Sequence, residues 1–470
     1  MKAPPFRVWI GVMIFFTTFT NYMLRSNISV SVVAMVGTRK SGFVPPCKRD
    51  QMKNTTENKT SAGGKERTFD WNEDRIGWIL TGYFWGYMVT LVPAGLLSEL
   101  IGPWHVILWS SLASGVLTGL TPLFAEGGYI GVVISRVFIG MLGGLAYPAA
   151  HVLIAKWAPP HEKGKFVAAM LGNTIGTMVT FNLVGWVSDA WGWQWGFYVL
   201  VILMAAFCLG FFFVVADTPE KSRCTSQEER DYIQESHHGS VSKKKAVAPY
   251  LKILTSIPFW AVCAAQFGNL WGLNLILTYT PKYLSETIGF NLKESAGLAS
   301  LPYLARMTAS GMFGILGDWM LKKEIMSVTR LRKFFIIFSH FIPAACLFMI
   351  RVAGCNQVGV VALLILCQFF NGAVVVSHFI NPQDLAPNFA GSVFGVMNFI
   401  GMTTGIFVPK ITGAITTHYN KNLAGATIIY TIGGSVYFCG GLLFIIFGTA
   451  KTQPWNEIKE TEPEPNQGNK

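Results

Sequence analysis

Stretches of about 20 mostly apolar residues recur along the chain, and each is long enough to cross a bilayer as a helix. Charged residues make up only 13% of the chain, whereas a soluble domain has about 25%. The sequence therefore predicts an all-α membrane protein. Twelve transmembrane helices are expected, at residues 8–36, 75–97, 104–124, 129–156, 165–188, 195–216, 258–283, 295–317, 333–351, 358–380, 390–414 and 424–449.

Two long polar stretches, 37–74 and 217–250, interrupt this pattern. The second is rich in Lys, Glu, Ser and His and leaves six spans on each side, so it is interpreted as a linker between halves. The predicted organisation is an N-terminal six-helix bundle with an outer loop, a cytoplasmic linker, a second six-helix bundle and a cytoplasmic tail, at residues 1–216 (loop 37–74), 217–250, 251–450 and 451–470.

A short motif occurs at matched places in the two halves. GLLSELIG, which ends at Gly102, follows the second span, and GILGDWML follows the eighth. Their acids, Glu99 and Asp318, are either solvated or cap a neighbouring helix that the glycines allow to approach. Matched positions favour the capping interpretation. Two pseudo-symmetric six-helix halves around a site in mid-membrane describe the major facilitator fold.

Basic residues indicate the orientation. Lys243, Lys244 and Lys245 lie in the linker, and further Lys and Arg residues join the eighth and ninth spans. The positive-inside rule places both segments in the cytoplasm. Because the number of spans is even, both termini are then predicted to be cytoplasmic as well. Loop 37–74 is also basic, but it carries two sequons, at Asn54 and Asn58, and is predicted to be outside and glycosylated.

The composition argues against other classes of protein. The formal net charge is +12, but the basic residues lie mostly in tails and loops, so nucleic acid is not an expected partner. The eight cysteines form no CxxC motif or Cys/His cluster, so no metal site is expected. Cys47 and Cys355 both fall in outer loops and could pair. The spans contain no nucleophile–base pair or phosphate loop, so neither catalytic residues nor enzyme activity is expected.

Three arginines lie well inside predicted spans: Arg25, Arg136 and Arg306. Insertion scales give a cost of about 2.5–3.5 kcal/mol for each. Snorkelling to the interface is easiest near helix ends, and acids are scarce within the spans. We therefore expect these arginines to line a positive, water-filled central cavity rather than to snorkel or to pair with an acid in the span. Arg306 could instead pack against the acid of a loop. A guanidinium fork suits a carboxylate or a phosphate, so the partner is predicted to be a transported anion.

Several strings resemble the anion–cation symporter branch of the major facilitators, which includes type I sodium–phosphate cotransporters, sialin and the vesicular glutamate transporters. The strings are YPAAHVLIAKWAPPHEKGK, GYFWGYMVTLVPAGLLSE, FINPQDLAPNFAGSVFGVMNFIG and KTQPW. The resemblance implies that Arg25 and Arg136 match the family arginines of the first and fourth spans. It also implies that Tyr147 and Asn398 belong to the substrate site, and that Asn381 and Asp384 hold inner helix ends.

The departures from the family pattern concern proton coupling. Where relatives carry acids in the fourth span, this chain has Gly143 and Ile139. The second-span His of the glutamate transporters falls at Leu80, and their seventh-span Arg falls at Asn269, a further candidate for the substrate site. Glutamate transport is therefore not expected, and the chain leans towards the phosphate and urate-like members.

The expected function is alternating-access secondary transport of organic or inorganic anions, driven by sodium or by the membrane potential. Two alternatives stay open: a proton-coupled, sialin-like carboxylate symporter, and a receptor or scaffold on the same fold. Apart from Na⁺ as a candidate coupling ion, no cofactor is expected. The expected partners are a small anionic substrate and membrane lipid. The chain is expected to be a monomer, in the plasma membrane rather than a lysosomal or vesicular membrane.

Overall fold

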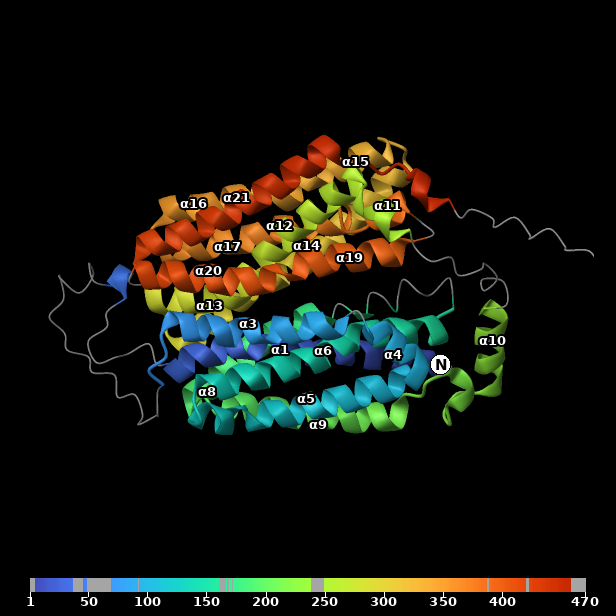
Figure 1. Ribbon diagram of the computed structural model, residues 1–470, viewed down its shortest axis with the longest axis horizontal. Helices are drawn as coiled ribbons and strands as arrows, with labels where there is room; N and C mark the ends of the chain where they lie inside the picture. Colours follow the sequence, from blue (N-terminus) through green and yellow to red (C-terminus); the bar gives the residue numbers. More distant parts are fainter. Residues whose placement is uncertain are drawn as a thin grey trace, which may run out of the picture.

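The structure is a computed structural model that describes residues 5–36, 45–48, 69–91, 93–159, 166, 169–170, 172–237, 249–386, 389–419 and 422–457. The described residues contain helices and no strand. The helices form two bundles that lie one above the other in Figure 1, with those up to α9 in one bundle and those from α12 onward in the other. The predicted all-α major facilitator architecture is confirmed.

Six segments of the described chain cross the first bundle. They are α1 (Arg7–Val36), α3 (Glu73–Leu91) continued by α4 (Pro93–Ile101), α5 (Pro103–Glu126), α6 (Tyr129–Trp157), α8 (Gly172–Trp191) and α9 (Trp195–Val214). Short helices follow in the linker: η1 (Pro219–Lys221), α10 (Gln227–His237) and α11 (Tyr250–Leu254).

Six more segments cross the second bundle, and several contain irregular turns. They are α12 (Ile257–Thr278) with α13 (Thr280–Lys282) and the π-helix η2 (Tyr283–Ile288); α14 (Leu292–Lys322); α15 (Val328–Ile336), the π-helix η3 (Ile337–Phe341) and α16 (Ile342–Ala353); α17 (Gln357–Asn371) with the 3₁₀-helix η4 (Gly372–Val375); α19 (Ala390–Met402) with α20 (Thr404–His418); and α21 (Leu423–Phe447). The short helices α18 (Asn381–Leu385) and η5 (Pro454–Asn456) lie outside these crossings. The sequence predicted all twelve crossings, with ends that differ by a few residues.

Four helices that contact the opposite bundle are too polar to be recognised as spans by composition alone. Among the described residues, eight of the twelve crossings are long and apolar enough to be recognised as spans by composition alone. The other four contain α1, α3, α8 and α14, and these helices contact the opposite bundle: α1 contacts α13, α3 contacts α20, and α8 contacts α14. Some of their polar residues make contacts between the two halves, such as Asn182 of α8 with Ser300 of α14.

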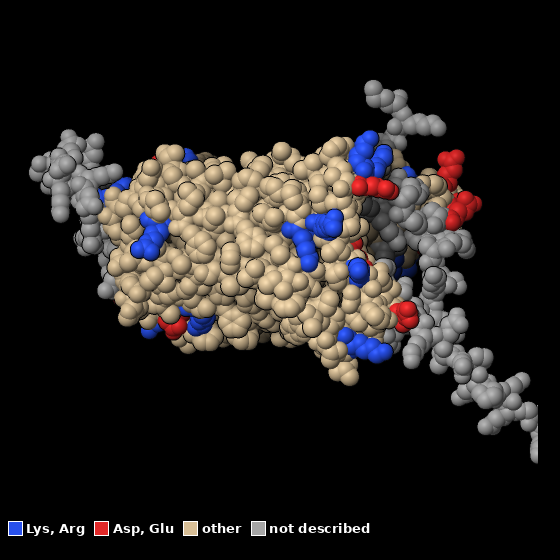
Figure 2. Space-filling view, turned by 90° about the horizontal axis from the view of Figure 1, so that it is seen from above, with Lys and Arg blue, Asp and Glu red and all other residues tan. Residues whose placement is uncertain are grey.

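The outer surface of the bundles is apolar. Large side chains such as Phe213, Leu209 and Leu123 are more than 60% exposed. In Figure 2 most of this face carries neither Lys and Arg nor Asp and Glu, and the charged side chains gather mainly towards the two ends. An apolar surface of this extent suits contact with lipid rather than water.

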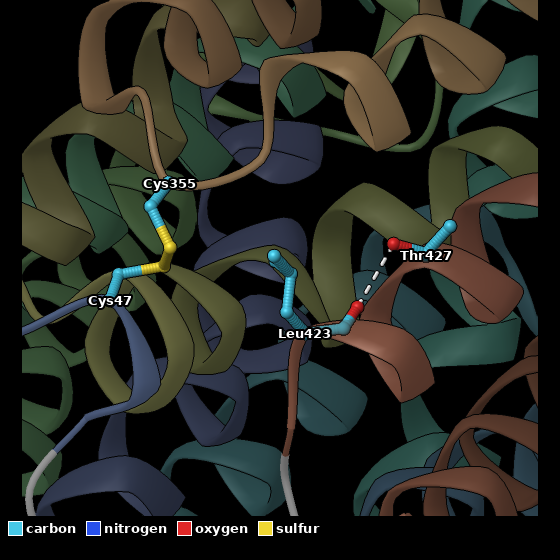
Figure 3. Close-up of a disulfide and its surroundings, with 4 residues drawn as sticks. All are labelled: Cys47, Cys355, Leu423 and Thr427. Atoms are coloured by element: carbon cyan, nitrogen blue, oxygen red, sulfur yellow. Dashed lines mark hydrogen bonds between the residues drawn. A yellow bond between two sulfur atoms is a disulfide. The ribbon is translucent and has the colours of Figure 1, made fainter. Parts of the chain in front are cut away.

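We name the two ends of the molecule by what they carry. The loop end carries residues 45–48 and 69–72, and the linker end carries residues 217–237 (Figure 1). At the loop end a disulfide joins Cys47 to Cys355, which lies between α16 and α17, and Figure 3 shows it close to the start of α21. The pairing that the sequence left open is therefore present, and it ties loop 37–74 to the second bundle.

The two bundles are closed against each other at the loop end. Lys282 pairs with Glu73, and Lys410 pairs with Asp74 at 3.3 Å. All hydrogen bonds, ion pairs and the disulfide between described residues of the two bundles lie from mid-membrane to the loop end. In α1 every residue from Met23 to Val33 is buried, whereas nearer the linker end the helix exposes Val12 and Phe16.

At the linker end, acids of the linker cap the bundle helices. Asp217 accepts a hydrogen bond from the backbone N–H of Trp104 at 3.0 Å, at the start of α5. Gly102 is required beside it, because its φ is 100° and a Cβ there would collide with the Asp217 carboxylate. Glu229 caps α1 in the same way, accepting hydrogen bonds from the backbone N–H groups of Phe6 and Arg7 at 2.9 and 3.0 Å.

The capping role expected of Glu99 and Asp318 is not seen among the described contacts. Glu99 lies in α4, and its side chain is outside the description. Asp318 is exposed near the end of α14 and accepts no hydrogen bond from a described residue. The prediction that Asp318 caps a neighbouring helix finds no support among the described contacts, and the cap of α5 comes from Asp217 after α9.

Candidate functional site

Arg136 is held by backbone carbonyls rather than by an acid. Its Nη1 donates to the carbonyl of Leu24 and its Nη2 to the carbonyl of Arg25, both at 2.9 Å. The residue is 2% exposed, and its guanidinium carbon lies 5.3 Å from the centre of the Tyr83 ring. Arg136 therefore ties α6 to the middle of α1. It does not present its fork to an anion in this structure, contrary to the expectation, because both terminal nitrogens are engaged.

Glycines bring α3 and α6 close enough for this arrangement. A Cβ at Gly140 would meet the backbone of Tyr83, and a Cβ at Gly86 would meet the backbone of Val137. The Tyr83 hydroxyl fills the space beside Gly143, where a Cβ would come within 2.5 Å of it. The Tyr83 hydroxyl therefore occupies the space beside Gly143, where the family pattern predicts an acid.

Arg25 touches both bundles. Its Nη1 donates to the Tyr22 hydroxyl at 3.1 Å, and its Nη2 donates to Asn274 Oδ1 of α12 at 3.3 Å. Its guanidinium carbon lies 4.9 Å from the centre of the Tyr22 ring and 4.8 Å from that of Phe84. Aromatic faces stabilise the charge without neutralising it. Asn274 is oriented in turn by a 2.9 Å hydrogen bond from its Nδ2 to Thr404.

Arg306 is the guanidinium with an unengaged fork. Its Nε donates to Asn371 Oδ1 at 2.9 Å. Neither terminal nitrogen donates a hydrogen bond to a described residue, and the side chain is half-buried. The alternative that Arg306 packs against the acid of a loop finds no support among the described contacts. Asn371 fixes the orientation of the fork because its Nδ2 donates to Asn269 Oδ1 and to the Ser339 carbonyl, both at 3.1 Å.

A buried chain of amides continues from Asn371 through the second bundle. Asn269 Nδ2 donates to Gln266 Oε1 at 3.3 Å, and Gln266 Nε2 donates to Asn398 Oδ1 at 3.2 Å. His378 Nε2 lies 3.0 Å from the same Gln266 oxygen. The structure thus brings together three predicted site residues, Arg306, Asn269 and Asn398. The sequence analysis missed Gln266 and Asn371, although amides within apolar spans were a signal that could have found both.

Neutral groups surround the two histidines of this region. His340 Nε2 lies 2.9 Å from the Ala265 carbonyl, to which it must donate, and its Nδ1 lies 2.9 Å from Ser339 Oγ. Both His340 and His378 are fully buried. Their described hydrogen-bond partners are hydroxyls, a carbonyl and an amide, which suit uncharged imidazoles. No group of three described His, Cys, Asp or Glu side chains could hold a metal ion.

Tyr147 lies on the first-bundle side of the same region. Its hydroxyl accepts a hydrogen bond from Asn173 Nδ2 at 2.6 Å, and its ring meets the Tyr22 ring edge to face, with 6.0 Å between centroids. Both tyrosines are half-buried. Tyr147 and Tyr22 therefore form an aromatic pair, and the Tyr22 ring packs against Arg25.

The other predicted residues that the structure describes are not in contact with Arg25, Arg136 or Arg306. Asp384 makes a two-pronged ion pair with Arg332, at 2.8 and 3.2 Å, and Asn381 donates to the Thr449 carbonyl at 3.0 Å. These contacts join α18 to α15 and to the end of the second bundle. Asn54 and Asn58 lie outside the described residues.

Comparison with known proteins gives the same fold. The family model of the Major Facilitator Superfamily matches residues 14–409. A solved D-xylose–proton symporter superposes with a TM-score of 0.64 at 17% identity, covering 94% of this chain and 99% of that one.

Two curated relatives match at higher identity. A putative inorganic phosphate cotransporter of Drosophila ananassae is 30% identical over 96% of this chain and 95% of its own length. Human sialin is 28% identical over 95% of this chain and 90% of its own length. The chain therefore belongs to the Major Facilitator Superfamily and is a multi-pass membrane transporter of the branch that contains the phosphate cotransporters, sialin and the vesicular glutamate transporters.

Proposed function

We propose that the chain carries small anions across the membrane, with inorganic phosphate and organic carboxylates as the candidate substrates. The observation that carries the proposal is the unengaged fork of Arg306, which is held in place by Asn371 in the middle of the membrane. A fixed guanidinium recognises carboxylate and phosphate oxygens. The names of the relatives, which include a phosphate cotransporter and sialin, point to the same substrate class.

The closure of the loop end supports alternating access. Arg25 belongs to the first bundle and donates a hydrogen bond to Asn274 of the second, so this contact changes when the two bundles move relative to each other. Arg306, Tyr22 and Asn398 are half-buried, so these residues are not fully sealed from solvent. A receptor or scaffold has no evident use for buried arginines, which are costly in a membrane.

The driving force is proposed to be the membrane potential or a sodium gradient. The positions expected to hold acids are Gly143, whose space is taken by the Tyr83 hydroxyl, and Ile139, which is 1% exposed in the core. Leu80 is buried as well. An anion bound by permanent charges carries net charge when the loaded transporter turns over, so a potential can drive it. Proton-coupled, sialin-like symport is not favoured.

The loop end is proposed to face away from the cytoplasm, with both termini and the linker inside. The Cys47–Cys355 disulfide supports this orientation, because disulfides persist in oxidising compartments and are rare in the cytosol. The plasma membrane is the proposed location, and the monomer is the proposed unit.

Uptake by purified protein in proteoliposomes tests the function. Radiolabelled phosphate, urate, sialic acid and lactate are offered in turn, with sodium and potential gradients imposed together, and protein-free liposomes serve as the control. Concentrative uptake of at least one anion is expected. If no anion enters faster than in protein-free liposomes, the transport proposal fails and the scaffold becomes the better interpretation.

A further inference from the structure

Tyr303 of α14 carries a buried hydroxyl that the structure leaves unused. The residue is 6% exposed, and its hydroxyl has no hydrogen-bond partner among the described residues. A buried hydroxyl without a partner costs free energy that a phenylalanine would not. Such a group is therefore expected to have a partner in another state of the protein, for example with substrate bound.

The position of Tyr303 identifies that partner as the anion. Tyr303 interacts electrostatically with both Arg25 and Arg306, which come from opposite bundles. Tyr22, which accepts the Arg25 hydrogen bond, interacts electrostatically with Arg306 as well. Tyr303 is therefore within electrostatic range of both guanidiniums, and it lies one turn from Arg306 on α14. Its hydroxyl is a neutral donor.

Tyr303 also lies at the inner edge of the sealed region. One turn towards the loop end, Ser300 accepts a hydrogen bond from Asn182 of α8 at 2.8 Å. Tyr303 itself meets the Phe181 ring edge to face at 5.8 Å across the bundles. One turn towards the linker end, Arg306 becomes half-buried. Along α14, Tyr303 therefore lies between a contact across the bundles at Ser300 and the half-buried Arg306.

We propose that Tyr303 is a substrate-binding residue, whose hydroxyl donates a hydrogen bond to an oxygen of an anion held by the Arg306 fork. The inference rests on the proposed anion transport and names a contact within it. The ligand class is a small oxyanion with oxygens directed to both sides, such as phosphate. Binding also gives the orphaned hydroxyl its missing partner, so it favours the state in which the two bundles hold Tyr303 between them.

The test compares two substitutions of the same kind. Tyr303→Phe removes the orphaned hydroxyl near the arginines. Tyr283→Phe is the matched control, because Tyr283 in η2 is 1% exposed and its hydroxyl is likewise unpartnered, but it lies in the loop-end segment. Uptake kinetics are measured in proteoliposomes with labelled inorganic phosphate, or with whichever anion of the panel the wild-type protein accumulates. Thermal unfolding of the anion-free proteins is measured in detergent.

Tyr303→Phe is expected to raise KM by about 10- to 100-fold, the effect of one hydrogen bond to a charged group. Its maximal rate should stay near the wild-type value, because binding energy common to ground state and transition state affects KM alone. The anion-free variant should unfold at the wild-type temperature or higher. Tyr283→Phe should share the unfolding result and leave KM unchanged.

The contrary results are distinct. A KM within twofold of the wild-type value for Tyr303→Phe, or an equal rise in both variants, overturns the inference while transport stands. A Tyr303→Phe protein that fails to fold, or unfolds at a lower temperature without anion, also overturns it, because the hydroxyl then has a structural partner. Failure of the wild-type protein to take up any anion of the panel overturns the proposed function and the inference with it.

Discussion

The ion pair between Lys282 and Glu73 offers a direct way to perturb the closure of the loop end. Lys282 ends α13 in the second bundle, and Glu73 begins α3 in the first. Both side chains are only 9% exposed, and Glu286 of η2 lies 3.9 Å from the same ammonium group. Lys282→Met removes the cation and keeps an unbranched side chain of similar length.

The size of the effect follows from this burial. Removing one partner of a buried ion pair costs about 3–5 kcal/mol, because the remaining charge is left uncompensated. The pair joins the two bundles, so the cost falls on the state in which the loop end is closed. At about 1.4 kcal/mol for each tenfold change, the equilibrium should shift towards opening by about two to three and a half orders of magnitude.

Thiol labelling measures the shift. Ala299 is fully buried in the sealed part of α14, so Ala299→Cys gives a reporter there. Its reaction with a membrane-impermeant thiol reagent should be slow in the otherwise unchanged protein and should accelerate, by up to the same factor, when Lys282→Met is added. Lys282→Arg is the control, because it keeps the charge and should keep labelling slow. Equal labelling rates in the Met and Arg variants would refute the assignment of this pair as a contact that closes the loop end.

Three further predictions concern other parts of the chain. Arg136→Lys loses at least one of the two carbonyl hydrogen bonds, so the free energy of unfolding should fall by about 1.5–3 kcal/mol; an unchanged value in denaturant titration would contradict the geometry. Gly143→Ala should cost about 1–3 kcal/mol through overpacking, and Tyr83→Phe should relieve most of that cost; a double-mutant cycle measures the coupling, which vanishes if the hydroxyl does not fill this space. Glycosidase treatment should increase gel mobility in a glycosylating host, and the double substitution Asn54→Gln with Asn58→Gln should abolish that shift; a shift that persists in the double variant would mean that the glycan is elsewhere.

Much of the fold follows from the sequence because bilayer thickness fixes the length of a crossing helix. The predicted seventh and tenth spans, 258–283 and 358–380, cover the segments α12–α13 and α17–η4. Their irregular ends are not visible in the pattern of apolar residues. Ser339 in η3 and Asn371 just before η4 make hydrogen bonds with residues 38 and 32 positions away along the chain, which the pattern of apolar residues does not show.

The site was only partly predictable, for the same reason. The sequence shows that Arg136 is buried without an acid in its own helix, but its partners are carbonyls 111 and 112 residues away. Lys282 lay within a predicted span, and a lysine in a span was a signal that could have indicated the closure at the loop end. Its partner Glu73 fell just outside the predicted second span, so the pairing was not visible. Tyr303 looked like any other aromatic residue of a span, and the sequence shows neither its unpaired hydroxyl nor the unengaged fork of Arg306 one turn away.

The central claim is that permanent guanidinium charges, rather than a titrating acid, bind the anion, so that potential or sodium drives transport. The most direct measurement is accumulation of the labelled anion in proteoliposomes with one gradient imposed at a time. Each elementary charge gains about 2.3 kcal/mol per 100 mV, enough for about a 50-fold gradient. Accumulation under a lumen-positive potential or an inward sodium gradient, and none under a pH gradient with the voltage clamped to zero, is the predicted result. Accumulation driven by the pH gradient alone would contradict the account and direct attention to His340 and His378 as proton carriers.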